Sequence, residues 1–491
     1  MTKVPTIPDF YSQQQIFITG STGFMGKVLV EKLLRSCSDL KIIYVLVRNR
    51  KEKSAQERWQ EITKAEVFDR LKKERPGILE KKIEVLCGDV KEKNLGLSTE
   101  NWKKLQENVS IIFHCAASVR FNDPLPEAVF INLRGSYEVI RLAQGMSKLK
   151  VLVHISTTYC NNFSTESGET IYPAPADWRK TIEIAEKLDP REVNILSAKY
   201  LGIFPNTYTF TKNLAERMIW DHRDQLPMVI IRPSIVICSL EEPMPGWIDN
   251  LYGPLGLMLG TAKGVVRVTL VDKDSIPDYM AVDIAIKAMI IAAWKKGVSP
   301  VNGDVPVYNA ASRSKGITNG EMIKISQQVN YKYPINEMLW YPFVTSTKSN
   351  LCFKYQAILK HLLPAIIVDQ IFKILGKKPM LLKVQITIYN AMMALGYFAT
   401  KTWNFANDNF LNLRNDILEE DKEQFNYEFD DMTPEEFIEM GIAKGRIYLL
   451  KEDESLLPQA RKKLRRLYWL DRFTSLSFKC FLGFAAYKYF F

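Results

Sequence analysis

Short apolar runs alternate with longer amphipathic stretches over the first three hundred residues of the chain. The runs are rich in Ile, Val and Leu, which is typical of buried strands, and the stretches between them carry apolar residues at helical spacing. Strands are predicted at 16–19, 42–47, 83–86, 111–114, 151–155 and 228–231. Helices between them, such as 27–34 and 125–143, predict a parallel sheet of the doubly wound α/β class.

The pattern changes beyond about residue 300, where the strand signal fades. Two apolar stretches, 351–375 and 381–398, are long enough for helices, and an acidic stretch follows at 416–439. We therefore expect a mainly helical domain after the α/β domain. A tail of different composition completes the chain.

These changes divide the chain into four expected parts. They are a Rossmann-type catalytic domain (1–300), the remaining substrate region with a linker (301–354), a helical domain (355–455) and a basic, aromatic tail (456–491). The stretch at about 160–206 is longer than a simple fold of this class needs. We interpret this stretch and the stretch at 240–275 as inserted segments that bind substrate. A loop on the protein surface explains the stretch at about 160–206 equally well.

The basic charge of the chain belongs to its tail. The 491 residues contain 66 Lys and Arg against 55 Asp and Glu, a net charge of +11. Residues 456–491 hold eight basic residues and one Asp, a net charge of +7, which leaves +4 for the rest. A basic face spread over a fold, as nucleic-acid binding requires, is therefore not indicated.

The cysteines and histidines argue against metal chemistry. The seven cysteines form no C-x-x-C pair and their number is odd, so neither a disulfide framework nor a zinc site is indicated. Four histidines make a histidine-centred site unpromising. Residues 1–10 lack the apolar run of a signal peptide, which favours a cytosolic location for the folded part.

A glycine-rich turn follows the first predicted strand. In such a turn the first glycine permits a tight bend, the second lets the backbone approach a pyrophosphate, and the third lets the helix pack on the strand. The helix N-terminus then faces the phosphates. The candidate dinucleotide-binding residues are Gly20, Ser21, Thr22, Gly23, Phe24, Met25 and Gly26.

The end of the second strand indicates which dinucleotide is bound. An NAD enzyme places a carboxylate there, whereas this chain has Arg48 and Arg50. Guanidinium groups suit a 2′-phosphate, so NADPH is the predicted cofactor, with an exposed basic loop as the alternative. Asp89 and Val90, after the third strand, match a pair that commonly holds the adenine.

A tyrosine and a lysine four residues apart are the candidate catalytic pair. On a helix, Tyr208 and Lys212 share a face, so Lys212 can lower the pKa of Tyr208 and reach the nicotinamide ribose. A second Tyr-x-x-x-Lys pair, Tyr397 and Lys401, lies in the predicted helical domain and is interpreted as ordinary helix packing.

Three adjacent hydroxyl groups follow the fifth predicted strand. They belong to Ser156, Thr157 and Thr158, and a hydroxyl at that position can hydrogen-bond a substrate carbonyl beside the tyrosine. The residues alone leave the choice among the three open.

Taken together, these residues resemble an extended short-chain dehydrogenase/reductase, and the chain is similar to the alcohol-forming fatty acyl-CoA reductases in particular. The similarity covers nearly the whole chain. The strings that carry it, apart from the glycine turn, are 28–35 (VLVEKLLR), 111–121 (IIFHCAASVRF), 231–236 (IRPSIV), 245–250 (PGWIDN) with Gly253-Pro254, and 376–379 (GKKP).

The resemblance implies a function and further site residues. The expected reaction is the NADPH-dependent reduction of a long-chain fatty acyl-CoA to a primary alcohol through an aldehyde, with release of coenzyme A. Aligned with the family motif, Thr157 is the carbonyl-binding hydroxyl and Ser156 the second choice. The resemblance also implies these cofactor-binding residues: Cys115, Ala116, Ala117, Asn132, Pro233 and Ser234.

Two other functions fit part of the pattern. A sugar-nucleotide or steroid dehydrogenase/epimerase uses the same glycine turn and Tyr–Lys pair, but the string at 245–250 and the apolar tail argue against it. A non-catalytic NADP-binding membrane protein has no chemical need for Thr157, Tyr208 and Lys212 together. The sequence does not determine the oligomeric state and is compatible with a homo-oligomer.

The tail joins a basic cluster, 461–466, to an aromatic stretch, 467–491. A membrane-spanning helix needs about 20 apolar residues. The stretch is interrupted by charged residues, namely Asp471, Arg472, Lys479 and Lys488. A helix lying in the membrane interface is equally plausible. Either form predicts a lipid surface as partner, with the catalytic domain in the cytosol at the endoplasmic reticulum or, alternatively, the peroxisomal membrane.

Overall fold

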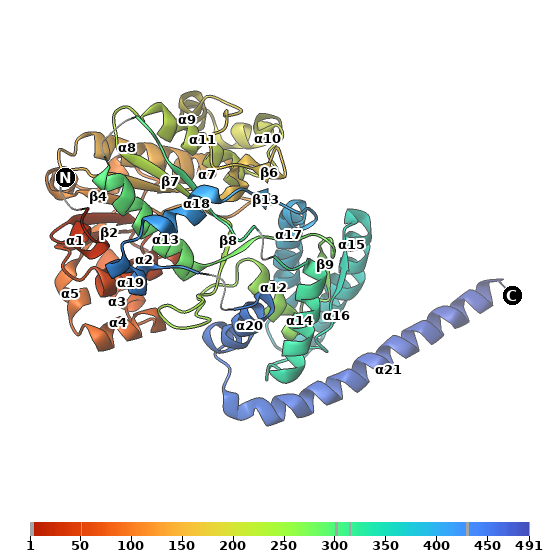
Figure 1. Ribbon diagram of the computed structural model, residues 1–491. Coiled ribbons are helices and arrows are strands. Elements are labelled where there is room, and N and C mark those ends of the chain that lie inside the picture. The colour runs from red at the N-terminus through yellow and green to blue at the C-terminus, as the bar shows by residue number, and fades with distance from the viewer. Residues whose placement is uncertain (1–3, 51, 300–302, 314–315, 429–431, 491) are drawn as a thin grey trace. The chain divides into compact units, whose positions relative to one another are not determined.

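The computed structural model describes residues 4–50, 52–299, 303–313, 316–428 and 432–490. The chain forms two compact units, each assembled from three segments (Figure 1). Unit 1 combines 1–245, 278–315 and 403–431, and unit 2 combines 246–277, 316–402 and 432–491. The expected helical range 355–455 is thus shared between the units, and the expected insertion 240–275 contributes mainly to unit 2.

Unit 1 is built on a parallel sheet. Among the described residues, seven strands form it in the order β11-β7-β5-β4-β1-β2-β3. The strands are β1 (Gln15–Thr19), β2 (Ile42–Val47), β3 (Ile83–Cys87), β4 (Ile111–His114), β5 (Val151–Ile155), β7 (Met228–Pro233) and β11 (Val307–Ala310). The chain adds β2 and β3 on one side of β1 and β4 on the other. The crevice between the carboxyl ends of β1 and β4 is therefore the place where this fold class binds ligands.

Helices cover both faces of this sheet (Figure 1). Helices α2 (Phe24–Ser36) and α13 (Val282–Val298) contact each other on one face. On the other, α6 (Thr99–Asn108), α8 (Gly135–Gln144) and α11 (Thr207–Asp221) bury apolar residues with Phe17 and Ile112. Since both faces are covered, the strands are apolar almost throughout.

The remaining elements of unit 1 are short or lie at its edges. The helices are α1 (Ile7–Tyr11), α3 (Ala55–Ile62), α4 (Asp69–Glu74), α5 (Ile78–Lys82), α7 (Leu125–Ala128), α9 (Trp178–Lys187), α10 (Pro190–Leu201), α18 (Asp408–Asn412) and α19 (Lys422–Phe425). The short strands are β6 (Glu166–Ser167), β8 (Ile235–Ile237), β10 (Tyr279–Ala281) and β13 (Asn404–Phe405). Strand β13 pairs with β6.

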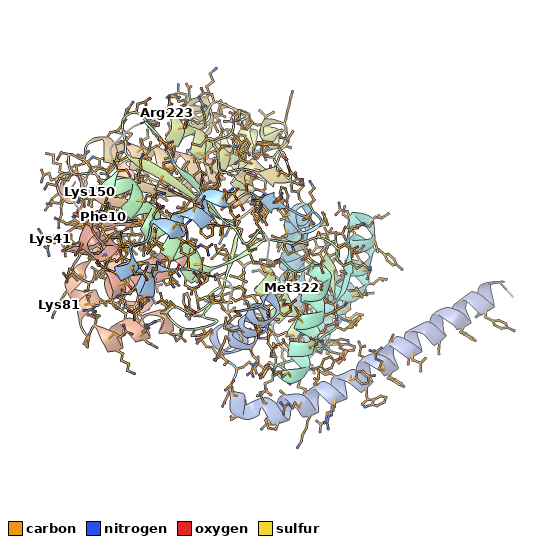
Figure 2. All side chains as sticks on the ribbon, in the orientation of Figure 1. Phe10, Lys41, Lys81, Lys150, Arg223 and Met322 are labelled. Atoms are coloured by element: carbon orange, nitrogen blue, oxygen red, sulfur yellow. The ribbon has the colours of Figure 1, made fainter. Side chains whose placement is uncertain are left out.

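Unit 2 is mainly helical. Its helices are α12 (Pro254–Ala262), α14 (Asn319–Lys332), α15 (Asn350–Ala357), α16 (Leu363–Ile374), α17 (Leu381–Ala399), α20 (Pro434–Leu450) and α21 (Leu457–Phe490). Strands β9 (Val268–Leu270) and β12 (Thr345–Thr347) pair in parallel. Capping boxes at Thr318 and Thr433 start α14 and α20. Met322 of α14, labelled in Figure 2, is buried in this unit.

The tail forms a single helix, α21, whose first turns belong to unit 2. Ala460 and Leu464 are buried, and Asp471 accepts hydrogen bonds from Trp340 Nε1 at 2.7 Å and Arg267 Nη2 at 3.2 Å. The first turns of the expected tail, 456–491, therefore pack within unit 2. Across the described residues, no helix combines the length and apolarity needed to span a bilayer.

Two details of the secondary structure go beyond the sequence expectations. The strand signal fades near residue 300 in the sequence, and the structure has one more strand of the sheet just after that point, the edge strand β11 at Val307–Ala310. The helix expected at 125–143 is interrupted by a π-helical segment, Val129–Arg134, between α7 and α8. A π-helical segment carries an extra residue per turn and often occurs at functional sites.

Candidate active site

The turn after β1 brings α2 close to the end of the sheet. Gly20 has a φ of +76°, and a Cβ on it would lie 2.6 Å from the backbone nitrogen of Ala116. A Cβ on Gly26 would lie 2.2 Å from the Gly20 carbonyl oxygen, so neither position tolerates a side chain. Gly23 caps α2, and its N–H donates to the Gly20 carbonyl oxygen at 3.0 Å. The backbone at the start of α2 is therefore open to a close approach by a ligand.

The other residues of the turn supply polar and apolar contacts to the same place. The Ser21 hydroxyl is buried and has no hydrogen-bond partner among the described residues. A buried hydroxyl without a partner at a helix N-terminus suits a phosphate oxygen, so the turn fits the pyrophosphate of a dinucleotide. Thr22, Phe24 and Met25 are half-buried around it.

Arginine side chains cluster after β2. Arg48 and Arg50 are exposed, and Arg58 of α3 donates a hydrogen bond to the Arg48 carbonyl oxygen. Burial, followed by the charges of Arg50 and Arg48, lowers the pKa of Arg58. The crowded guanidinium groups favour a bound anion. The sequence does not single out Arg58, because it lies on a helix. Residues that distinguish NADPH from NADH are expected at the end of the second strand.

The residues after β3 face this arginine cluster. Asp89 Oδ2 lies 3.7 Å from Arg48 Nη1, and Asp89 Oδ1 accepts the Lys91 N–H at 3.1 Å. Val90 is buried, and a Cβ on Gly135 would lie 2.9 Å from the Val90 carbonyl oxygen. The pair expected to hold the adenine is thus in place beside Arg48, with Asp89 already forming an ion pair.

The residues after β4 lie against the glycine turn. The Cys115 N–H donates to the Thr19 carbonyl oxygen at 3.2 Å, and the Ala116 N–H donates to Thr19 Oγ1 at 3.3 Å. Ala117 follows, half-buried like its two neighbours. Burial raises the pKa of the Cys115 thiol to about 12, so this sulfur stays protonated at neutral pH.

Asn132 connects the π-helical segment to α11. Its Oδ1 accepts the Ser118 N–H at 2.8 Å, and its Nδ2 donates to Thr211 Oγ1 at 3.1 Å.

Pro233 and Ser234, at the end of β7, are buried, and the Ser234 N–H donates to the Ala310 carbonyl oxygen at 3.0 Å. These residues frame the carboxyl end of the sheet.

Tyr208, Thr157 and Lys212 meet at the end of β5. Thr157 lies beside the Tyr208 hydroxyl, and Ser156, whose buried hydroxyl has no hydrogen-bond partner among the described residues, lies beside the Cys160 thiol. Lys212 Nζ donates to the Ile155 carbonyl oxygen at 2.6 Å and is 3% exposed. The structure thus brings the predicted pair together with the second of the three hydroxyl residues.

The pKa values differ from the sequence expectation. Burial raises the pKa of Tyr208, an effect that the hydrogen bond from Thr157 only partly opposes. Burial also lowers the pKa of Lys212 to about 8. The expected lowering of the Tyr208 pKa by Lys212 is therefore outweighed, because the ammonium group is directed at a backbone carbonyl and both groups are desolvated. Tyr208 keeps its proton at neutral pH and can act as an acid.

Two neighbouring histidines are neutral. His114 Nδ1 lies 2.7 Å from Thr19 Oγ1, and His114 Nε2 lies 2.9 Å from Ser136 Oγ. Burial and then the Lys212 charge lower the pKa of His114 to about 3 and that of His154 well below its usual value. A neutral His114 holds the ends of β1 and β4 in place and leaves Lys212 as the cation of the site.

A polar network that the sequence analysis did not identify fixes α11. Asn206 caps the helix by accepting the Thr209 N–H at 2.9 Å, and Asn162 Nδ2 donates to Thr209 Oγ1 at 3.0 Å. One turn further, Asn213 Nδ2 donates to Asn161 Oδ1 at 2.9 Å. Asparagine directly before a helix is a sequence signal that could have identified Asn206 as the cap.

A buried ion pair anchors the same helix to β7. Arg232 donates two hydrogen bonds to the Glu216 carboxylate, at 2.7 and 2.6 Å, and both side chains are almost fully buried. Glu216 also accepts from the Cys160 thiol at 3.1 Å. Two parallel hydrogen bonds fix the relative orientation of the guanidinium and the carboxylate as well as the distance between them. The pair therefore sets the rotation of α11 about its axis.

Phe121 stacks on the catalytic candidate. Its ring centroid lies 5.8 Å from that of Tyr208, with an interplanar angle of 26°. The stacked ring restricts the χ angles of Tyr208. The family-like string at 111–121 ends on this residue, but the sequence analysis gave it no role.

The second Tyr–Lys pair has a different environment. Tyr397 is in the last turn of α17, and Lys401 lies just beyond the end of that helix. Lys401 Nζ sits 3.6 Å from the centre of the Tyr397 ring, a cation–π contact. This arrangement supports packing at a helix end, as the sequence analysis predicted.

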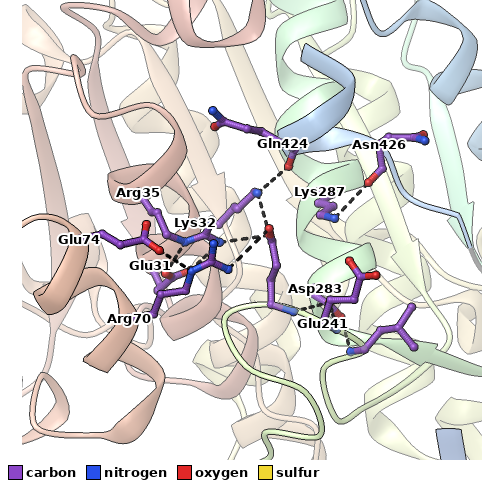
Figure 3. Close-up of polar contacts among 12 residues, drawn as sticks. Glu31, Lys32, Arg35, Arg70, Glu74, Glu241, Asp283, Lys287, Gln424 and Asn426 are labelled. Carbon is purple, nitrogen blue, oxygen red and sulfur yellow. Dashed lines mark hydrogen bonds and ion pairs between the residues drawn. The ribbon is translucent and has the colours of Figure 1, made fainter. Parts of the chain in front are cut away.

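A charged cluster on α2 looks like a second site but is structural (Figure 3). Lys32 Nζ donates to Glu242 Oε2 at 2.7 Å and to the Gln424 carbonyl oxygen at 2.6 Å. Burial raises the pKa of Glu242, but nearby cations, Lys32 first, outweigh burial and hold it at about 2. Asp283 accepts the N–H groups of residues 240–242. The cluster ties three segments of unit 1 together.

The comparisons with known families agree with this geometry. A family model described as "Male sterility protein" matches residues 18–289, and a second with the same description matches residues 360–452. "Fatty acyl-CoA reductase 1" of Xenopus laevis is 37% identical over 467 residues, covering 94% of this chain and 90% of the relative. A "Putative fatty acyl-CoA reductase" of Drosophila melanogaster is 36% identical, covering 96% and 93%.

Solved structures share the fold at low sequence identity. The reductase domain of a nonribosomal peptide synthetase from Mycobacterium tuberculosis matches with a TM-score of 0.59 and 16% identity, covering 91% of this chain and 94% of that one. The terminal R domain of the myxalamid pathway matches with a TM-score of 0.57 and 19% identity, covering 90% and 92%.

Proposed function

This chain belongs to the fatty acyl-CoA reductase family, and on that basis we propose that it reduces long-chain fatty acyl-CoA to primary fatty alcohol with NADPH. The reaction passes through an aldehyde and releases coenzyme A. The observation that carries the proposal is the meeting of Thr157, Tyr208 and Lys212 at the end of the sheet that also carries the glycine turn. Those two features together supply a cofactor site and a proton donor for carbonyl reduction.

The residues that would hold the cofactor fit a nicotinamide dinucleotide. The open backbone at Gly20, Gly23 and Gly26 and the unpartnered Ser21 hydroxyl suit the pyrophosphate. Arg48 and its arginine neighbours suit the 2′-phosphate that distinguishes NADPH from NADH. When bound, the cofactor supplies the hydride for a carbonyl carbon.

The roles of the catalytic residues follow from their contacts. Tyr208 donates its proton to the carbonyl oxygen as negative charge develops there, and the Thr157 hydroxyl donates a hydrogen bond to the same oxygen. Lys212 keeps a positive charge beside the site, which stabilises the tyrosinate left behind. Ser156, whose buried hydroxyl has no hydrogen-bond partner among the described residues, stays the second choice for this contact.

One such site suffices for both reductions. The first turns the thioester into a hemithioacetal, whose collapse releases coenzyme A as a thiol and leaves an aldehyde. The aldehyde carbonyl then meets the same proton donor, Tyr208, and is reduced to the alcohol. The four-electron reduction therefore requires two equivalents of NADPH and no acyl-transfer nucleophile.

The proposal is tested by product identification. The detergent-solubilised protein is incubated with palmitoyl-CoA and NADPH, and the lipids are identified by mass spectrometry. Hexadecanol is the expected product. A product mixture without alcohol or aldehyde, from protein that binds NADPH, would reject the proposal and favour another reaction of the same fold.

The pH dependence of the reaction is expected to follow Lys212. Its pKa of about 8 means that the ammonium form predominates below that pH and is lost above it. The kcat/KM of the enzyme should therefore be flat near neutrality and fall about tenfold per pH unit above pH 8. The raised pKa of Tyr208 keeps its own titration out of this range.

The matched variant for this prediction is Lys212→Arg, whose guanidinium stays charged at high pH. Its activity, whatever its absolute level, should show no decline near pH 8. An unchanged alkaline decline in this variant would mean that another group controls the profile.

We also propose that the second half of α21 attaches the protein to the cytosolic face of the endoplasmic reticulum or peroxisomal membrane. Beyond Asp471 the helix presents exposed apolar side chains, namely Phe473, Leu476, Phe484 and Tyr487. The basic residues Arg465 and Arg466, also exposed, precede them. Basic groups next to aromatic ones are typical of helices that bind at the headgroup level.

Truncation after Arg472 is expected to lower the membrane-bound fraction of the protein and to leave its folding intact, since it keeps Leu464 and Asp471. Truncation after Pro458 removes both and should also lower the midpoint of thermal unfolding. Co-sedimentation with vesicles and circular dichroism measure the two effects. If the bound fraction is unchanged after truncation at Arg472, the tail does not have the proposed attachment role.

A further inference from the structure

Helix α16 of unit 2 carries a continuous apolar stripe that the unit leaves exposed. Its outward residues recur at three- and four-residue spacing, so they share one face of the helix. They are Leu363, Ile366, Ile367, Ile371, Ile374 and Leu375, with exposed fractions from 41% to 84%. Ala365 and Asp369, on the opposite face, are buried. An apolar face of this extent in water normally marks an interaction surface.

The stripe continues into the turn that leads to α17. Gly376 has a positive φ, and the next residues up to Met380 are all exposed. Ile374, at the helix end, and Met380, at the other side of the turn, are 84% and 59% exposed. The turn between α16 and α17 thus presents large apolar side chains to solvent.

The charges around this stripe have one sign. Residues 350–402 contain seven lysines and a single acidic residue, Asp369. That carboxylate is buried and accepts the N–H groups of Met380, Leu381 and Leu382 at the start of α17, so it does not face outward. Lys373, Lys377, Lys378 and Lys383 are all exposed around the turn. This segment therefore pairs apolar side chains with a net positive charge.

We infer that the α16 stripe and the lysines of the α16–α17 turn form a second membrane-binding surface, which docks on an anionic phospholipid bilayer. The isoleucine and leucine side chains enter the boundary between headgroups and acyl chains, while the lysines contact the phosphates. In this arrangement the unit lies on the bilayer surface, with the helix axis in the plane of the headgroups. This surface is separate in sequence from the exposed end of α21, and its existence does not depend on the proposed reaction.

The two components of the surface have different experimental signatures. The full-length protein is mixed with vesicles of phosphatidylcholine, with or without about one third phosphatidylserine, and its partition coefficient is measured by flotation. Lys377→Gln with Lys378→Gln should lower binding to the anionic vesicles roughly 30-fold and hardly change binding to the neutral ones. Ile374→Gln with Leu375→Gln should lower binding to both at least about tenfold.

Matched controls come from unit 1. Lys72 and Lys73 are an adjacent, exposed lysine pair on α4. Ile195 of α10 is 80% exposed, close to the value for Ile374, but lies near the acidic Asp189 and Glu192. Lys72→Gln with Lys73→Gln, and Ile195→Gln, should bind vesicles like the unchanged protein.

Two results would overturn the inference. One is unchanged vesicle binding by both α16 variants, which would leave α21 as the attachment device. The other is an equal loss in the unit 1 controls, which would mean unspecific adsorption. Circular dichroism and turnover of a detergent-presented substrate should stay unchanged in all variants, because every substituted side chain is exposed.

Discussion

Tyr208→Phe is expected to lower acyl-CoA turnover by roughly two to four orders of magnitude, the usual contribution of a general acid. The substitution keeps the ring that stacks on Phe121 and removes only the hydroxyl beside Thr157. The site geometry should therefore survive while the proton donor is lost. Steady-state kinetics measure the effect, and the dissociation constant of NADPH, from fluorescence titration, should change little.

The chain supplies its own control for this experiment. Tyr397→Phe removes a hydroxyl from the second Tyr–Lys pair, where Lys401 lies over the ring face and needs no hydroxyl. Its turnover should match that of the unchanged enzyme. Comparable losses in the two variants would show that Tyr208 has no special role.

Arg48→Asp is expected to shift the ratio of kcat/KM values from NADPH toward NADH on the order of 100-fold, since hydrogen bonds to charged groups contribute roughly 1.5–3 kcal/mol. The new carboxylate would stand beside Asp89, the present partner of Arg48 at 3.7 Å, and together they would repel a 2′-phosphate. The same carboxylate accepts hydrogen bonds from ribose hydroxyls, which favours NADH.

Binding measurements separate this effect from catalysis. The dissociation constants of NADPH and NADH should change in opposite directions in Arg48→Asp. Arg50→Asp and Arg58→Gln are the companion variants, since both residues belong to the same cluster. If Arg48→Asp keeps the preference of the unchanged enzyme while one companion loses it, that companion is the selector.

The α/β half of the fold was predictable because parallel strands buried on both faces leave continuous apolar runs. Strand β2 was predicted with its observed bounds, 42–47. Strand β11 was missed because Val307–Ala310 is short and follows a proline. It is recognisable only by pairing with β7, which lies more than seventy residues earlier.

The way the units interleave along the chain was not predictable from local pattern. Segment 403–431 follows the helices of unit 2 but belongs to unit 1, where Phe405 pairs with Ser167. The composition of that segment does not indicate that the chain passes from unit 2 back into unit 1. The tail shows the same limit, because its basic, aromatic composition does not indicate that its first turns pack in unit 2, where Asp471 is paired with Arg267 and Trp340.

At the site, the motif residues could be named from sequence, but the groups that position them could not. Tyr208 and Lys212 follow from their spacing on a helix. The pair of Glu216 with Arg232, sixteen residues apart, depends on how α11 lies on β7. The pKa values depend on burial in the same way, which is why the raised pKa of Tyr208 was not anticipated.

The central claim is that one proton-donating site performs both reductions, and the ratio of NADPH oxidised to coenzyme A released tests it most directly. The two quantities are followed in the same reaction with palmitoyl-CoA, by absorbance of the nicotinamide and by thiol titration. A ratio of two, with hexadecanol as the lipid product, is the result that this account predicts. A ratio of one, with free aldehyde accumulating, would contradict it.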